Sequence, residues 1–188
     1  MKHFVFLEFT NPKLRNFLTD LRSVFYKKQF TSAVHITVRG PYEHPPNKDD
    51  LEPLLEKLQG YGLVISGTGI FETKQGYVVY LKVTSPIFEE IWWKPDFKDE
   101  GVNPHITLYE TRNIDHANKV ERFLKSERIE ISTFSFTLTA YTSKQGELFE
   151  ETLDSVKLKK VSSFEKWGVK AGILQRAKKL IDSLCQPI

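Results

Sequence analysis

The chain has 188 residues, of which 40% are hydrophobic and 13% aromatic, a composition typical of a folded globular protein rather than a disordered one. Its net charge of +3 gives no strong signal for binding a polyanion, and its single cysteine, Cys185, excludes an intramolecular disulfide framework. No apolar run approaches the roughly 18 residues of a membrane span, and the start FVFLEF is too short for a signal peptide. We therefore expect a cytoplasmic protein with no membrane partner.

The first part of the chain predicts the order strand, helix, strand, helix, strand. These elements cover about residues 3–9, 11–28, 33–39, 49–59 and 63–71. Asn11-Pro12 favours a helix start, because proline is tolerated in the first helical turn, and Gly40-Pro41 ends the second strand.

The same order recurs in the second part of the chain. It predicts strands at about residues 77–83, 105–110 and 130–142, and helices at about 85–93 and 115–125. The two units, about 2–72 and 76–142, predict one two-lobed α+β domain over residues 1–160 with a pseudo-twofold axis between the lobes. A turn at 144–146 adds one further strand.

Residues 161–188 are expected to form a C-terminal amphipathic helix over about 164–184. Its apolar stripe comprises Phe164, Trp167, Ala171, Leu174, Ile181 and Leu184. Such a stripe packs on the body of a domain or on a partner. Self-association through this helix therefore stays open.

Two of the predicted strands carry nearly the same motif, HITV at 35–38 and HITL at 105–108. With only five histidines in the chain, random order would give about 0.4 His-x-Thr triplets. A lone strand histidine is more often structural than catalytic. Two copies in equivalent strands indicate a shared function.

Strand alternation predicts which side chains share a face. One row comprises His35, Thr37 and Arg39, and the other comprises His105, Thr107 and Tyr109. Aliphatic residues alternate with them and point to the core. Pressing two such polar rows together without water or ligand would leave polar groups unpaired, at a cost of about 1–3 kcal/mol each. We therefore expect the rows to line a wet cleft between the lobes.

Two imidazoles that face each other suit a reaction that needs a general base and a general acid near neutral pH. In-line displacement at phosphorus is such a reaction. The hydroxyls of Thr37 and Thr107 can bind the phosphate oxygens, and Arg39 can add a charge-assisted contact. A metal site is the competing interpretation, but it would want a third ligand, and no ligand spacing such as HExxH is present. We predict no metal and no cofactor.

The paired motifs resemble those of the two-histidine (2H) phosphoesterase superfamily, whose signature is a pair of H-x-T/S-hydrophobic motifs. Residues 3–158 are similar in order and spacing to its 2′-5′ RNA ligase-like and RNA 2′,3′-cyclic phosphodiesterase branch. The resemblance implies a bilobal fold in which two antiparallel sheets flank a central groove with helices outside. It also implies that His35 and His105 share the acid and base roles while Thr37 and Thr107 hold the phosphate.

The chain departs from this family at one point of the second motif. Several members follow it with a basic residue, where this chain has Tyr109, and Arg112 comes three positions later. Arg39 is the stronger candidate for the phosphate contact and Arg112 the weaker one. Nucleotides need a stacking surface, for which Tyr109 and Tyr42 are candidates.

The sequence thus predicts a metal-independent phosphodiesterase that acts on the 2′,3′-cyclic phosphate of an RNA end or nucleotide. Related substrates, namely 2′-5′ oligoadenylate or cyclic oligonucleotides, remain alternatives. Ligation of RNA ends is the same chemistry in reverse. A module that binds nucleotides or RNA ends without turnover is the alternative from a different class. The sequence leaves the substrate, the product and the assignment of base and acid open.

Overall fold

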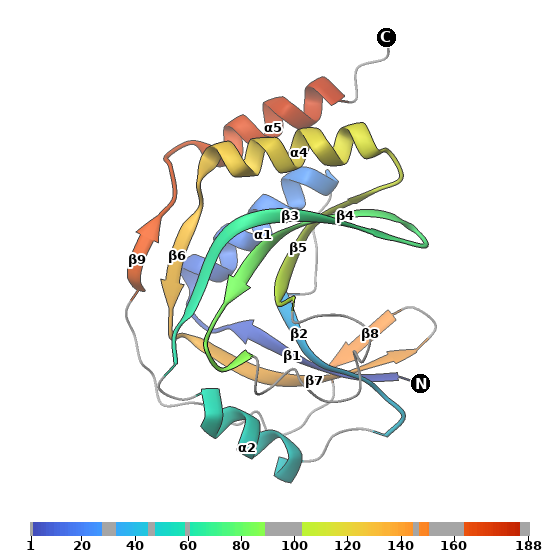
Figure 1. Ribbon diagram of the computed structural model, residues 1–188, viewed down its shortest axis with the longest axis vertical. Coiled ribbons are helices and arrows are strands. Elements are labelled where there is room, and N and C mark those ends of the chain that lie inside the picture. The colour runs from blue at the N-terminus through green and yellow to red at the C-terminus, as the bar shows by residue number, and fades with distance from the viewer. Residues whose placement is uncertain are drawn as a thin grey trace.

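A computed structural model describes residues 2–27, 33–44, 48–58, 61–88, 103–144, 147–150 and 164–184. These residues form an α+β fold with two antiparallel sheets and four helices (Figure 1). The elements are β1 (Lys2–Phe9), α1 (Pro12–Tyr26), β2 (His35–Tyr42), α2 (Lys48–Leu58), β3 (Leu63–Thr73), β4 (Gly76–Thr84), β5 (His105–Thr111), α4 (Ile114–Glu127), β6 (Glu130–Thr133), β7 (Phe136–Lys144), β8 (Glu147–Glu150), β9 (Phe164–Gly168) and α5 (Ile173–Leu184). None of the described helices is long and apolar enough to cross a membrane.

The two sheets repeat one arrangement of strands. The first sheet has the order β2-β1-β7-β8, and the second has the order β5-β4-β3-β6-β9. The series β2-β1-β7 therefore corresponds to β5-β4-β3, with each sheet taking its third strand from the other predicted unit. Both His-x-Thr strands lie at a sheet edge, and these two edges, β2 and β5, contact each other.

The helices cover the outer sides of the sheets. Figure 1 shows α2 beneath the first sheet, whereas α4 and α5 lie above the second, which is curled. Helix α4 contacts β3, β4 and β5, and α1 contacts β5 and α5. Aliphatic side chains that alternate along the central strands face these helices, and they are fully or almost fully buried: Val5, Leu7, Val79, Leu81 and Val83. This alternation leaves the opposite face of each sheet for the histidine rows.

Two asparagines start helices, as polar N-cap residues do. The side chain of Asn11 accepts hydrogen bonds from the backbone N–H groups of Lys13 and Leu14. Asn113 accepts in the same way from Asp115 and His116. The predicted start of the first helix is therefore confirmed.

The single strand predicted over 130–142 is wrong, because the chain changes sheets within it. β6 pairs with β3 in the second sheet, whereas β7 pairs with β1 in the first. Between them, the backbone N–H of Ser135 donates to the side-chain oxygen of Thr133 at 3.0 Å. This local turn replaces a ladder hydrogen bond, and a short break of this kind has little signature in a run of β-forming residues.

The terminal helix is shorter than predicted. Residues 164–168 form β9, which pairs with β6, and the helix begins only at Ile173. Gly172, with φ of 73°, lies just before the helix in the left-handed region that favours glycine. The buried side of α5 carries Ile173, Ala177 and Ile181.

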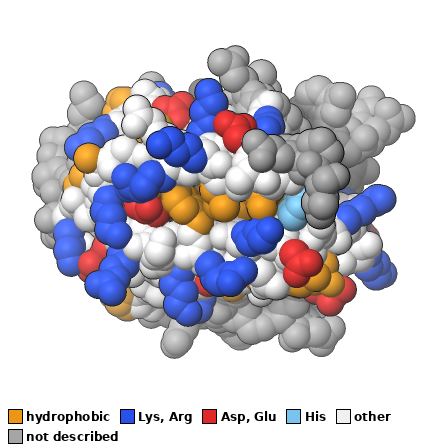
Figure 2. Space-filling view, turned by 90° about the horizontal axis from the view of Figure 1, so that it is seen from above, with side chains coloured by type: hydrophobic (Ala, Val, Ile, Leu, Met, Phe, Trp, Pro, Cys, Tyr) orange, Lys and Arg blue, Asp and Glu red, His pale blue; other side chains and the backbone are white. Residues whose placement is uncertain are grey.

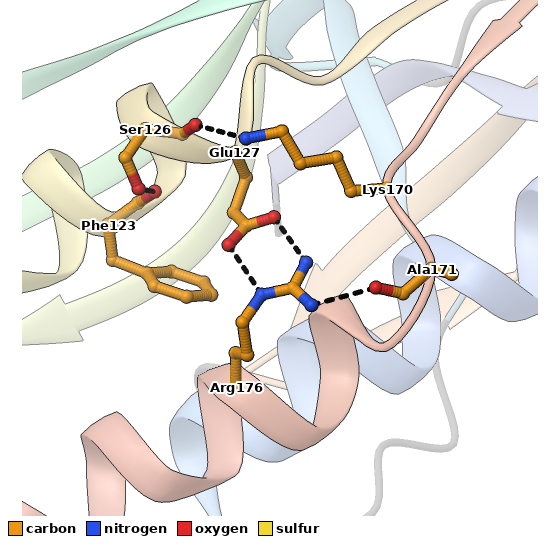
Figure 3. A network of polar contacts seen from close by, with 6 residues as sticks. All are labelled: Phe123, Ser126, Glu127, Lys170, Ala171 and Arg176. Atoms are coloured by element: carbon orange, nitrogen blue, oxygen red, sulfur yellow. Dashed lines mark hydrogen bonds and ion pairs between the residues drawn. The ribbon is translucent and has the colours of Figure 1, made fainter.

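An ion pair attaches α5 to the end of α4 (Figure 3). The guanidinium of Arg176 donates from Nε to Glu127 Oε1 at 2.8 Å and from Nη2 to Oε2 at 2.6 Å. A third donation reaches the carbonyl of Ala171, and Lys170 Nζ donates to the carbonyl of Ser126 at 2.7 Å. Helix α5 therefore packs on the body of the domain.

Exposed basic side chains gather on the outer helical surface. Figure 2 shows this side of the molecule, where Lys and Arg side chains surround a short apolar row. The basic residues that are exposed on α4 and α5 are Lys119, Arg122, Lys125, Arg176, Lys178 and Lys179. These basic side chains thus lie on the outer helices and not on the strands β2 and β5, which carry His35 and His105.

Some predictions fall outside the described residues. The helix predicted over 85–93 is described only as far as Phe88, and Cys185 also lies outside. The backbones of Arg39 and Tyr42 belong to β2, but their side chains are not among those described.

Candidate functional site

β2 presents His35 and Thr37 on one face. Both side chains are half-buried, whereas Ile36 and Val38 between them are fully buried. β5 repeats this pattern, with His105 and Thr107 half-buried, and with Ile106 and Leu108 fully buried. The predicted alternation is confirmed for these two motifs.

The two imidazoles are held by the same local contact. His35 Nδ1 lies 3.2 Å from the carbonyl oxygen of Ala33, and His105 Nδ1 lies 2.7 Å from that of Asn103. In each case the carbonyl belongs to the residue two positions before the histidine. A carbonyl can only accept, so Nδ1 carries the hydrogen in both rings. Nε2 is then the nitrogen that takes or gives the second proton.

Aromatic rings surround the imidazole of His35. Phe6 stacks on it with ring centroids 3.8 Å apart and an angle of 8° between the planes. Tyr141 lies on the other side of this neighbour, at 4.8 Å from the Phe6 centroid. Phe6 is 3% exposed, so the stacked face of the histidine is shielded from water.

His105 also lies among aromatic rings. The centroids of Phe71 and Tyr80 are each 5.1 Å from its imidazole. A Cβ at Gly69 would clash with the ring of Tyr80. Glycine at this position of β3 therefore lets Tyr80 extend across the neighbouring strand.

The pKa of His35 is lowered from 6.5 to about 4. Burial is the largest cause, since it disfavours the charged ring. The positive charges of Arg22 and protonated His105 act in the same direction, and the hydrogen bond with Ala33 opposes them. His35 is consequently neutral at pH 7. Its interaction with His105 also places the two imidazoles within electrostatic range of each other.

Arg22 is a site residue that the sequence interpretation missed. It lies on α1, is 8% exposed, and its pKa is lowered chiefly by burial. The buried side of this helix also carries Leu14, Leu18 and Phe25. An arginine four residues after Leu18, on an otherwise apolar stripe, is the signal that could have identified it.

Tyr109 does not share the face of His105, and the prediction for it is wrong. The register of β5 against β4 shifts between Thr107 and Tyr109, so that Tyr109 pairs with the core residue Val79. This β-bulge adds one residue and changes the alternation. The ring of Tyr109 instead packs on α1, at 6.3 Å from Phe25 and 5.9 Å from Tyr26.

Arg112 follows the end of β5 opposite to the one that carries His105. It is exposed just beyond β5, seven positions and therefore roughly 23 Å of extended strand from His105. There it lines a cavity of about 730 Å³ together with Lys74, Gln75 and Glu110. The structure does not bring Arg112 to the paired motifs.

Glu8 is the second residue that the sequence interpretation missed. It is the Cα partner of His35 on the neighbouring strand, and its side chain is half-buried. Its carboxylate accepts hydrogen bonds from Thr139 Oγ1 at 3.1 Å and from Tyr141 Oη at 2.6 Å. Strand alternation alone predicts that Glu8 points away from the apolar face of β1. That it lies beside His35 depends on the pairing of β1 with β2, which the sequence does not show.

Among the residues that the structure describes, no three or more His, Cys, Asp or Glu side chains group closely enough to hold a metal ion. The paired histidines have hydroxyl, aromatic and guanidinium neighbours. Half-buried hydroxyls and a buried guanidinium are groups that bind anions. A scan of the sequence against protein-family models gives no match, and a search of curated proteins gives no significant similarity.

Proposed function

We propose that this chain is a metal-independent phosphodiesterase that opens the 2′,3′-cyclic phosphate of RNA ends or nucleotides, and that its fold is that of the two-histidine phosphoesterases. One observation carries this proposal: two half-buried histidines on adjoining edge strands make the same Nδ1 contact two residues upstream. Two imidazoles oriented alike, one from each sheet, suit a reaction with a proton transfer on either side of phosphorus.

The protonation state of His35 supports an assignment of roles. Because burial keeps this imidazole neutral at pH 7, His35 serves as the general base. Its Nε2 takes a proton from water, and the water oxygen attacks phosphorus. The bond from phosphorus to one ribose oxygen breaks, and protonated His105 gives its proton to that oxygen. The product is a phosphate monoester.

The two threonines and Arg22 complete this proposal. The hydroxyls of Thr37 and Thr107 lie on the same strand faces as the histidines and donate to the non-bridging oxygens. The buried guanidinium of Arg22 contributes positive charge beside the reacting phosphate.

The test is hydrolysis of 2′,3′-cyclic nucleotides and of RNA with a cyclic phosphate end, in the presence of EDTA. We expect His35→Ala and His105→Ala each to lose about 10²- to 10⁴-fold in kcat. His116→Ala, on helix α4, is the matched control and should keep the wild-type rate. Full activity in either variant of the paired histidines would refute the proposal, as would loss of activity in EDTA that a divalent metal restores.

A further inference from the structure

The carboxylate of Glu8 is held on the same sheet face as His35. The Cα partners on this face are Glu8 with His35 and Phe6 with Thr37. Hydroxyl groups of β7, on the other side of β1, donate to both carboxylate oxygens. The carboxylate is therefore oriented by two hydrogen bonds and directed away from β2, toward β7.

A carboxylate at this place does not suit the phosphate itself, because the two negative charges repel. An ionised carboxylate has about four acceptor sites on its two oxygens, and Thr139 and Tyr141 occupy one on each. Among the residues that the structure describes, these two hydroxyls leave one acceptor site on each oxygen. This geometry fits a ligand edge that presents two adjacent N–H donors.

Aromatic rings form a cluster beside the carboxylate. Phe6 lies between His35 and Tyr141, with centroids 3.8 Å and 4.8 Å from theirs, and Phe4 follows at 5.9 Å from Phe6. Tyr141 is half-buried and brings its hydroxyl to Glu8. Phe6 itself is 3% exposed, whereas Phe4 and Tyr141 are half-buried and leave part of their rings accessible. A planar base is recognised by stacking on such rings and by hydrogen bonds to its edge.

The spacing matches a nucleotide. Neighbouring strands lie about 4.8 Å apart, so the hydroxyls of β7 are roughly 10 Å from the histidine row on β2. A nucleotide spans a comparable distance from its phosphate to the far edge of its base. A phosphate at His35 would therefore place its base above β1 and β7.

We propose that Glu8, oriented by Tyr141 and Thr139, forms a base subsite that selects guanine. This inference rests on the proposed function, since it assumes a nucleotide whose phosphate lies at the paired histidines. Guanine has adjacent N1–H and N2–H donors on its Watson–Crick edge, and these match the two carboxylate oxygens. Adenine, cytosine and uracil each place an acceptor beside a donor there, and this acceptor would face a carboxylate oxygen.

The test compares kcat/KM for the 2′,3′-cyclic phosphates of guanosine, adenosine, cytidine and uridine. The wild-type chain should prefer guanosine by about tenfold or more. In Glu8→Gln the carboxamide presents one donor and one acceptor, which no longer match the two adjacent donors of guanine, so the guanosine preference should be lost. Glu121→Gln is the matched control, because Glu121 is also half-buried and accepts a hydroxyl hydrogen bond, from Thr68 at 2.6 Å. This variant should retain the wild-type base preference.

Equal rates on all four bases in the wild type, or an unchanged guanosine preference in folded Glu8→Gln, would overturn the subsite. Tyr141→Phe keeps the ring and removes one hydrogen bond that orients the carboxylate, so it should weaken the guanosine preference. If circular dichroism shows that Glu8→Gln is unfolded, an unchanged preference in Tyr141→Phe overturns the proposal instead.

Binding measurements separate this inference from the proposed function. Isothermal titration of wild type and of His105→Ala with the same four cyclic phosphates reports base preference without turnover. Guanosine-selective binding by a chain that hydrolyses none of them would support the subsite and refute the catalysis. Hydrolysis without base preference would refute the subsite and support the catalysis.

Discussion

Phe6 lies flat against His35, with their ring planes 8° apart, and this contact covers one face of an imidazole whose pKa is about 4. The two residues come from neighbouring antiparallel strands, in which Phe6 is the Cα partner of Thr37 rather than of His35. The stacking is therefore diagonal across the sheet. It keeps the ring in one orientation and removes it from water on that side.

Replacing Phe6 by leucine should raise the pKa of His35 from about 4 toward 6.5, because water regains access to the ring. Titration of the histidine ring protons by NMR measures this change. Phe4→Leu, on the same strand face but farther from His35, is the control and should leave the pKa as it is. If the pKa of His35 stays at about 4 in Phe6→Leu, the Phe6 ring is not what shields this imidazole from water.

The same pKa shift sets a pH dependence of stability. The unfolded chain takes up a proton at His35 near pH 6.5, whereas the folded chain does so only near pH 4. The unfolded state thus binds more protons between these values, and stability falls as the pH is lowered through this window. Phe6→Leu should show a shallower decrease in the free energy of unfolding across the window than Phe4→Leu, as measured by urea denaturation.

Arg22→Met should also raise the pKa of His35, since it removes a buried positive charge near the ring. If His35 is the base, the acidic limb of the kcat/KM profile should move to higher pH. Arg15→Met, an exposed substitution on the same helix, should leave that limb in place. If the acidic limb does not move in Arg22→Met, the charge of Arg22 does not lower the pKa of the catalytic base.

Tyr109→Ala should lower stability by about 2–4 kcal/mol and change kcat/KM by less than about threefold. The reason is the β-bulge, which directs this ring to Phe25 and Tyr26 on α1 rather than to the histidines. Thr107→Val is the contrasting variant and should lose activity while remaining stable. Chemical denaturation together with steady-state kinetics separates the two effects. A large decrease in kcat/KM with unchanged stability in Tyr109→Ala would contradict the placement of this ring on α1 and away from the histidines.

Arg176→Met should lower the melting temperature by roughly 3–6 °C at pH 7, because it leaves the carboxylate of Glu127 buried without this partner. The pKa of Glu127 is lowered from 4.5, mainly by its hydrogen bonds with Arg176. The stabilisation is therefore present above pH 4.5 and is lost as the pH falls through the lowered pKa. Thermal melts at pH 7 and pH 3 should show the difference between wild type and variant shrinking at pH 3. Lys179→Met, exposed on the same helix, should match wild type at both pH values.

The sequence by itself determined the local features of this protein. The alternation of His35, Ile36, Thr37 and Val38 follows from strand geometry alone, and its repetition in residues 105–108 indicated two equivalent strands. The N-cap at Asn11 was also visible, because capping depends on residues within one turn of the helix.

Only the tertiary structure decided which strands adjoin and therefore which side chains meet. The chain leaves one sheet for the other between β6 and β7, and the bulge in β5 turns Tyr109 toward α1. Both depend on the strand opposite, which a local pattern does not contain. Glu8 and Arg22 joined the histidines for the same reason: β1 pairs with β2, and α1 packs on β5. Contacts between residues far apart in the chain are fixed by burial and pairing of whole elements, so they appear only once the chain has folded.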